Sequence, residues 1–407
     1  MNILIVNTFY YPRGGAPVYG LNLASMLRQQ GHNVIPFSMK SPHNLQSPYE
    51  DYFVDYIDFR EELSGGIKNS MKVLRRIFYF KQARENIEKL LSQHKIDIVH
   101  LNNFLHHIGL SIIQPIKERN IPIVWSLHDH ILVCPNTNLF DDKRKCACDI
   151  CSSNFRRYIL PWIRRCKKNS FGASLLASME ALYNSLFRVS GIPEKFIAPS
   201  NFLMEQHKKM GFDISNFEVV PNFVEIEHFQ PHYEPGDYLF YFGRLSAEKG
   251  VENLIRAANM IKIPLVIAGS GPQQEELKKL SQDLQSDTKF LGFIQGEKLR
   301  EAIYNSRIVV LPSVCYENAP LMILETYASG KPVVGSDIGG ITEMIPPEVG
   351  KLFPSGDIDA MANKIISLWN DKSQIVQMSK CGRKLVEQKY SSKIHLQNIM
   401  RIYNEII

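Results

Sequence analysis

Two glutamates eight positions apart are the first candidates for chemistry in this 407-residue sequence. Glu317 and Glu325 lie in the segment LPSVCYENAPLMILETYASGKPVVG, which spans residues 311–335. Pro320 stands between them, before an apolar run. Proline is favoured at a helix start, because its missing N–H would have no partner within the helix. We therefore predict that Glu317 lies in a loop and Glu325 about one turn inside a helix.

A helix that begins at this point leaves the backbone N–H groups of residues 318–322 free to bind an anion such as a diphosphate. Strand-like runs flank the segment at 307–311 and 331–335. Open α/β sheets bind ligands where a loop leaves the carboxyl end of a strand. The alternative is an ordinary β-α-β unit with two unrelated glutamates.

A second stretch, YFGRLSAEKG at residues 241–250, offers two cations after an apolar strand. Arg244 presents a planar fork of donors, and Lys249 a mobile point charge. Together they can neutralise a diphosphate leaving group, although either residue alone in a loop is usually just solvated.

In combination, these stretches resemble the retaining glycosyltransferases of family four, which have the two-domain GT-B fold. The resemblance rests on Gly243-Arg244-Leu245, Lys249-Gly250 and the glutamate pair. Further fragments in the same order are VVPNFVE at 219–225, IAGSGP at 267–272, FLGF at 290–293 and SDIGGITEMI from 336. One departure is Asn318-Ala319-Pro320, where the family often has glycine-phenylalanine-glycine. This departure leaves the donor sugar open.

The resemblance implies an α/β protein of GT-B architecture, with two Rossmann-like parallel-sheet domains facing a central cleft. Residues 1–224 would bind the acceptor, with a C-terminal helix at 391–407 packing back on them. Residues 225–236 would be the linker and 237–390 the nucleotide-sugar domain. Alternating patterns favour strands at 2–7, 33–37, 97–101, 121–127, 196–199, 219–221, 238–242, 264–269, 288–291, 307–311 and 332–335.

Site roles follow from the same resemblance. His128, at a strand end, would lie near the donor sugar's primary hydroxyl, where a neutral imidazole can accept a proton or donate a hydrogen bond. Arg244 and Lys249 would hold the diphosphate, Glu317 the donor sugar and Glu325 the ribose hydroxyls. The other donor-binding candidates are Gly14, Gly15, Gly243, Gly269, Gly271, Gly292, Phe293, Asn318, Ala319, Pro320 and Leu321. A structural His128 and a plain turn at the glycine pair are the alternatives.

The expected reaction is transfer of a sugar, with retention, from a UDP- or GDP-sugar to a hydroxyl of a glycan or a polyprenyl-diphosphate-linked acceptor in cell-surface polysaccharide synthesis. No cofactor or catalytic metal is expected, and no Asp-x-Asp motif follows a strand. A non-catalytic nucleotide-sugar binder and a sugar-nucleotide epimerase remain alternatives. The dinucleotide fingerprint is missing, which disfavours a nicotinamide enzyme.

Composition is that of an ordinary soluble protein, with 44% apolar and 22% charged residues. No apolar run approaches the roughly 18 residues that span a bilayer. The N-terminus MNILIVNTF leads straight into a strand, without the pattern of a signal peptide. We therefore expect a cytoplasmic protein, or one peripheral on the inner face of the cell membrane.

Positive charge is concentrated in the first half of the chain. Residues 1–190 hold 24 Lys and Arg against 15 Asp and Glu. Residues 143–168 contain nine basic residues, one acid and several aromatics, a pattern that suits an anionic membrane surface. A predicted helix at 71–91 would add Lys72, Arg75, Arg76, Lys81 and Arg84 to this surface. A solvated basic face is the alternative, and no nucleic-acid motif accompanies the charge.

Five of the seven cysteines lie between residues 134 and 166. In a cytosolic chain, such a cluster favours metal or redox chemistry over disulfides. Cys134, Cys146, Cys148 and Cys151 could close a structural zinc site. Unliganded thiols are the alternative.

Overall fold

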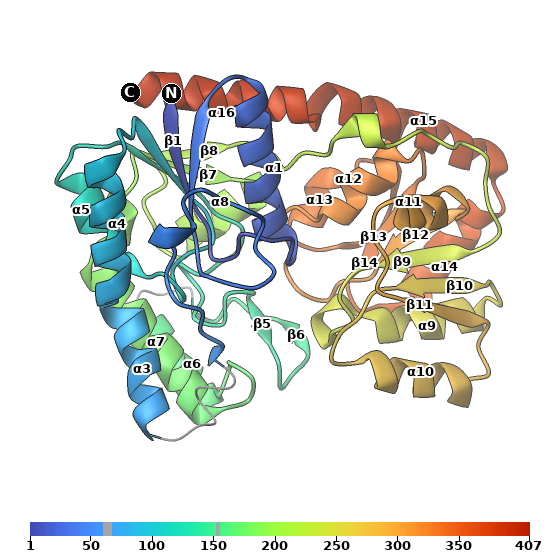
Figure 1. Cartoon of the computed structure of the whole chain (residues 1–407). Coiled ribbons are helices and arrows are strands. Elements are labelled where there is room, and N and C mark those ends of the chain that lie inside the picture. The colour runs from blue at the N-terminus through green and yellow to red at the C-terminus, as the bar shows by residue number, and fades with distance from the viewer. Residues whose placement is uncertain (60–66, 152–154) are drawn as a thin grey trace.

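Two six-stranded parallel sheets, each covered by helices, make up the chain (Figure 1). The computed structural model describes residues 1–59, 67–151 and 155–407. The first sheet has the order β2-β1-β3-β4-β7-β8 and the second the order β11-β10-β9-β12-β13-β14. A short antiparallel pair, β5-β6, stands apart from both. The α/β class and the two Rossmann-like sheets agree with the prediction from sequence.

The strands of the first half are β1 (Asn2–Val6), β2 (Asn33–Phe37), β3 (Ile98–Leu101), β4 (Ile123–Ser126), β5 (Phe140–Asp141), β6 (Cys146–Ala147), β7 (Lys195–Ala198) and β8 (Phe217–Val219). Those of the second half are β9 (Leu239–Phe242), β10 (Leu265–Ala268), β11 (Thr288–Gly292), β12 (Ile308–Leu311), β13 (Val333–Asp337) and β14 (Gly350–Pro354). β9 and β12 are apolar throughout and fully buried, as expected where helices cover both faces of a sheet. β14 was not predicted, because glycine and proline bound its short apolar run.

The helices of the first half are α1 (Gly15–Gln29), α3 (Ile67–Phe78), α4 (Lys81–Gln93), α5 (Ile113–Lys117), α6 (Arg156–Arg164), α7 (Phe171–Leu186) and α8 (Asn201–Lys209). Those of the second half are α9 (Val251–Met260), α10 (Gln274–Asp283), α11 (Glu297–Tyr304), α12 (Leu321–Ala328), α13 (Gly340–Met344), α14 (Ile358–Trp369), α15 (Lys372–Lys389) and α16 (Ser392–Ile406). Among the described residues, no helix combines the length and the apolar character needed to cross a bilayer.

The single helix predicted at 71–91 is wrong, because α3 and α4 are separate helices. Phe80 lies between them in an extended conformation. Its backbone N–H donates to the Ser111 hydroxyl at 2.7 Å, and the guanidinium of Arg76 lies 3.8 Å from its ring centroid. The contact with Ser111, 31 residues away, is a tertiary interaction that outweighs the local helical periodicity.

The last helix, α16, packs against α1 on the first sheet, while α15 packs on α12 in the second half (Figure 1). Ile399 and Ile402 of α16 share a core with Ile3 and Leu23. Nδ1 of His100, on β3, lies 2.5 Å from the Tyr403 hydroxyl. The end of the chain therefore returns to the first domain, as the resemblance implies.

Candidate active site

The order of the second sheet reverses between β9 and β12, which pair directly. In open α/β sheets, ligands bind outside the carboxyl ends of the strands at such a switch point. The loop after β9 carries Arg244 and Lys249, and the loop after β12 carries Glu317. These loops are in contact, because the backbone N–H of Val314 donates to the Glu248 carbonyl at 2.9 Å. Lys249 and Glu317 thus meet at one edge of the sheet, and Arg244 lies in the same loop as Lys249.

Lys249 and Glu317 form an ion pair at this edge. The ammonium lies 2.5 Å from Oε1 of Glu317, and the side chains are 25% and 13% exposed. The Ser313 hydroxyl donates to the same oxygen at 2.7 Å. Burial by itself raises the pKa of Glu317, but the ammonium and the hydroxyl reverse this effect and hold its pKa below the ordinary value. Burial likewise opposes the charge of Lys249, yet Glu317 raises its pKa above the ordinary value. Both groups are therefore charged at neutral pH.

Several of the predicted donor-binding glycines lie where backbones approach one another. A Cβ on Gly269 would lie 1.8 Å from the Gly243 carbonyl oxygen, and one on Gly271 would lie 2.2 Å from the Leu245 carbonyl oxygen. Gly292 differs, since its Cβ would meet nothing within 4 Å, although its φ is +68°. The loops after β9 and β10 approach each other so closely that packing alone requires glycine at positions 269 and 271.

Arg244 and Phe293, which were predicted to contact the nucleotide-sugar donor, are both exposed. Arg244 is exposed, and its carbonyl accepts a hydrogen bond from the Tyr241 hydroxyl at 2.9 Å, which fixes the backbone beneath it. Phe293, after β11, is 70% exposed. An exposed guanidinium and an exposed ring are both accessible to a ligand.

The helix predicted after Pro320 is present as α12, with Pro320 at its N-cap in an extended conformation. Asn318 and Ala319 lie in the loop before it, and Leu321 is its first residue. Glu325 is therefore one turn inside the helix, as predicted. Burial raises the pKa of its carboxyl group to about 7. Within the described part of the chain, its carboxylate has no hydrogen-bond partner, so the group is available to a ligand with hydroxyl donors.

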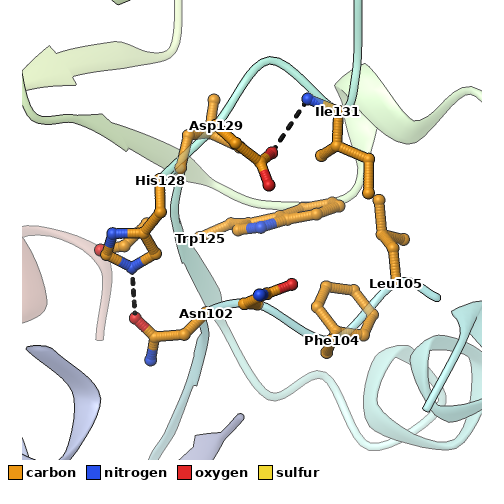
Figure 2. A pocket seen from close by; sticks show the side chains of 10 residues that line it. Asn102, Phe104, Leu105, Trp125, His128, Asp129 and Ile131 are labelled. Atoms are coloured by element: carbon orange, nitrogen blue, oxygen red, sulfur yellow. Dashed lines mark hydrogen bonds between the residues drawn. The ribbon is translucent and has the colours of Figure 1, made fainter. Parts of the chain in front are cut away.

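His128 follows β4, at the carboxyl edge of the first sheet (Figure 2). Its Nε2 lies 3.1 Å from the Oδ1 of Asn102, which follows β3. Burial, with a smaller contribution from His395, lowers the pKa of His128 to about 4. The imidazole is therefore neutral at physiological pH, as the predicted role requires.

The two halves of the site are joined through Asn318. Its Nδ2 donates to the His128 carbonyl at 2.9 Å, and the Nδ2 of Asn222 donates to the Ala319 carbonyl at 2.9 Å. A pocket of about 550 Å³ between the domains is lined by Asn201 and Phe202 on one side and by Tyr316 and Gly339 on the other. The structure thus brings the loops of His128 and Glu317 together.

Sequence reasoning missed three residues of this site. Ser313 positions Glu317, and Asn102 contacts His128. Glu343 accepts from the backbone N–H of Asn201 across the domain boundary at 3.1 Å. The first two follow the ends of buried strands, which is a signal that the sequence does contain.

Gly14 and Gly15 lie at the start of α1, after β1. Gly14 has a φ of +80°, and a Cβ on either glycine would meet no atom within 4 Å. Both are exposed. Packing therefore does not explain this glycine pair, and its contact with the donor stays a prediction.

Three of the four predicted zinc ligands, Cys134, Cys148 and Cys151, lie close enough for their thiols to interact electrostatically, and metal binding by the cluster stays a prediction. Cys134 is buried, Cys146 is exposed on β6, and Cys148 and Cys151 are half-buried. Across the described ranges, no group of three or more His, Cys, Asp or Glu side chains is arranged to hold a metal ion. Burial is the first cause that raises the pKa of Cys151 to about 12. Its thiol is therefore protonated at neutral pH.

The predicted basic surface is smaller than the sequence suggests. Arg76 and Arg157 are buried, at 4% and 8% exposure. Arg76 donates to the His107 carbonyl at 2.6 Å, and Arg157 donates to the Leu132 carbonyl at 3.4 Å. The side chain of Lys72 and residues 152–154 lie outside the described residues. Lys81 and Arg84 lie on α4 and pair with Glu85 and Glu88. The remaining cations of residues 143–168 lie on α6, in the turn after it and in the β5–β6 turn.

Comparison with known proteins places this geometry in a family. The model of Glycosyltransferase Family 4 matches residues 13–228, more than half of the chain. The chain belongs to Glycosyltransferase Family 4. A second model, Glycosyl transferases group 1, matches residues 223–385 and covers the Lys249–Glu317 pair.

Relatives and solved structures agree with this assignment. An uncharacterized glycosyltransferase of Methanocaldococcus jannaschii is 27% identical over 410 residues, which cover 96% of this chain and 95% of the relative. An uncharacterized 42.6 kDa protein of the Klebsiella pneumoniae cps region is 27% identical over 379 residues, covering 89% and 92%. Anabaena HepE in complex with UDP superimposes with a TM-score of 0.70 at 16% identity, with 100% of both chains covered. Sucrose-phosphate synthase from Thermosynechococcus elongatus has a TM-score of 0.71 at 19% identity, covering 100% and 98%. This family 4 glycosyltransferase thus has the GT-B fold.

Proposed function

We propose that this glycosyltransferase moves a sugar, with retention of configuration, from a UDP- or GDP-sugar to a hydroxyl of a glycan or lipid-linked acceptor in cell-surface polysaccharide synthesis. The observation that carries the proposal is the Lys249–Glu317 ion pair at the switch point of the second sheet, where the loop that carries Lys249 also carries the exposed Arg244. A diphosphate at this edge would meet two cations and the N-terminus of α12. Negative charge that develops on the leaving group would therefore be stabilised where it forms.

The same edge offers groups for the rest of the donor. The carboxylate of Glu325, which has no hydrogen-bond partner among the described residues, has two oxygens that suit the vicinal hydroxyls of a ribose. Phe293 offers an exposed ring for the base, next to the backbones of Gly269, Gly271 and Gly292. The solved HepE complexes contain UDP, and one of them also glucose, which makes UDP-sugars the first donors to test.

The acceptor would approach from the first domain. There the backbone carbonyl of His128 accepts a hydrogen bond from Asn318 of the second domain. The neutral imidazole can hydrogen-bond a sugar hydroxyl without adding charge. Glu317 is ion-paired with Lys249, which makes its carboxylate a poor nucleophile. We therefore assign no covalent intermediate to Glu317, and the acceptor would attack from the face that the diphosphate leaves.

We also propose that transfer needs no divalent cation, since Arg244 and Lys249 supply the charge that a bound Mg²⁺ would otherwise provide. The measurement is nucleotide release with and without EDTA. Equal rates are expected, and a loss of activity that Mg²⁺ or Mn²⁺ restores would refute this part of the proposal.

The experiment that tests the main proposal is a panel of UDP- and GDP-sugars, screened by thermal shift and then by nucleotide release with candidate acceptors. A bound donor raises the melting temperature by mass action. Acceptor-dependent release is expected. Binding without release for any acceptor would favour a nucleotide-sugar binder, and a changed sugar without acceptor would favour an epimerase.

A further inference from the structure

Helix α7 exposes an apolar stripe along its whole length. Its exposed large side chains are Phe171, Leu175, Met179, Leu182 and Leu186, with exposures of 50%, 36%, 45%, 44% and 73%. Their spacings of four, four, three and four residues place them on one face of the helix. A surface helix normally carries polar side chains on its outer face. The outer face of α7 carries apolar side chains instead.

The exposure of the stripe does not come from loose packing, because the opposite face of α7 is fixed. Ala177, Glu180 and Asn184 are buried there. The Glu180 carboxylate lies 2.8 Å from Nδ1 of His106, and the Tyr183 hydroxyl donates to the carbonyl of Phe78 in α3. The helix is thus held in one orientation, with its apolar stripe outward.

Neighbouring elements extend this apolar surface. Phe155 and Ile163 of the α6 segment are 70% and 57% exposed, Phe187 is 55% and Tyr79 is 54% exposed. Helices α6 and α7 pack against each other, and α3 contacts α7. In Figure 1 the three helices lie together at the lower left, at the opposite end of the first domain from the chain termini. Exposed hydrophobic surface is therefore concentrated on this one corner, which we call the α6–α7 face.

The segment that forms the α6–α7 face carries more cations than acids. Between residues 155 and 188 the chain carries Arg156, Arg157, Arg164, Arg165, Lys167, Lys168 and Arg188. The single acid in that range, Glu180, is buried and paired with His106. Arg157 is itself buried, and the exposed Asp142 accepts from the backbone N–H of Lys168, which leaves an excess of exposed cations. Exposed apolar side chains flanked by such an excess are the pattern of a segment that lies in the interface of an anionic bilayer.

We propose that the α6–α7 face docks this protein on an anionic lipid membrane, with the stripe of α7 inserted among the lipids and the flanking cations on the headgroups. A second copy of the chain fits less well, because a symmetric contact would bring the cations of both copies together. The Glu180–His106 contact joins α7 to the loop that follows β3 at the carboxyl edge of the first sheet. The stripe lies on the far side of α7 from this contact, about one helix diameter, roughly 10 Å, away. A membrane-bound acceptor would thus be close to the site. Vesicle binding itself does not depend on the proposed transfer.

The test is co-flotation of the full chain with phosphatidylcholine vesicles that contain or lack phosphatidylglycerol. Binding to the anionic vesicles, weakened by salt, is expected. The stripe variant Leu182→Ser/Leu186→Ser should lower the vesicle partition coefficient by about tenfold or more, and Arg156→Glu/Arg165→Glu should abolish the preference for anionic lipid. Met260→Ser is the matched control, since Met260 is 54% exposed on α9, and it should bind like the wild type.

Equal binding to both vesicles, or wild-type binding by the stripe variant, would overturn the proposal. So would a lipid-free dimer that sedimentation shows to dissociate in the stripe variant, because the stripe would then belong to a second copy. The thermal shift caused by UDP is measured on the same variants and should be unchanged. A chain that binds anionic vesicles but no nucleotide would contradict the proposed function and support the docking face.

Discussion

The ammonium of Lys249 lies 2.5 Å from a carboxylate oxygen of Glu317, although 68 positions separate the two residues in the chain. Strand order brings them together, because β9 and β12 are neighbours and each residue lies in the loop after its strand. Neither charge can be removed without leaving the other half-buried and uncompensated. This dependence determines what substitutions at the pair should do.

Replacing Lys249 should reduce both activity and stability. Loss of one hydrogen-bond donor to the charge that develops in the transition state typically lowers turnover about 100- to 1000-fold. The unpaired Glu317 carboxylate should cost on the order of 1–3 kcal/mol of unfolding free energy. Nucleotide release and urea denaturation of Lys249→Ala measure the two effects. In Lys249→Ala/Glu317→Ala part of the stability should return, and a fully additive loss would contradict the pairing.

Arg244→Ala should separate activity from stability, because the exposed guanidinium makes no hydrogen bond or ion pair within the described chain. Turnover should fall about 100-fold or more, while the melting temperature stays at the wild-type value. Lys298→Ala, which removes an exposed cation elsewhere in the same domain, is the matched control and should be fully active. Wild-type turnover in Arg244→Ala would remove the diphosphate contact from the proposal.

Donor binding should depend on pH through Glu325, whose pKa is raised to about 7 by burial. Ribose hydroxyls favour the ionised carboxylate, so binding lowers this pKa and releases a proton. Below pH 7 the affinity for UDP should fall by up to about tenfold per pH unit. Titration calorimetry in buffers of different ionisation enthalpy measures the released proton, which Glu325→Gln should abolish.

The same carboxyl group should affect stability in the opposite direction. Its pKa in the folded protein lies above the unfolded value, so the folded state is favoured at low pH, and this contribution is lost as pH rises from about 4.5 to 7. At pH 8, Glu325→Gln should therefore be more stable than the wild type.

In steady-state kinetics, Glu325→Ala should raise the KM of the donor, whereas Glu317→Ala should lower kcat. The reverse pattern would refute both assignments.

Acid should unfold the first domain through its buried histidines. Burial lowers the pKa of His100, His107 and His130 to about 3, and that of His128, His207 and His395 to about 4. Unfolded histidines take up protons near pH 6.5, whereas these six stay neutral in the fold, so stability should fall steadily from pH 6.5 towards pH 4. Chemical denaturation across this range measures the slope. His207→Gln, at a site where the ring stacks on His130, should make the slope shallower, and an unchanged slope would contradict the prediction.

Much of this protein could be read from local sequence, because torsion preferences and periodicity act over a few residues. Pro320 correctly marked the start of α12 and placed Glu325 one turn inside it. The 372–389 helix was predicted with its observed bounds. The glycines and basic residues that follow buried strands indicated the edges of the sheets. In combination, those fragments were specific enough to indicate the family.

Tertiary structure decided what local sequence could not, because contacts between distant loops depend on strand order and on which faces meet. The Lys249–Glu317 pair, the burial of Arg76, and the packing of Gly269 against Gly243 all join segments whose proximity no spacing predicts. The sequence of α7 equally suits a buried helix, since its apolar residues follow an ordinary helical period. Only the packing of Glu180 and Tyr183 against the rest of the first domain shows that the apolar stripe of α7 is the face turned to solvent.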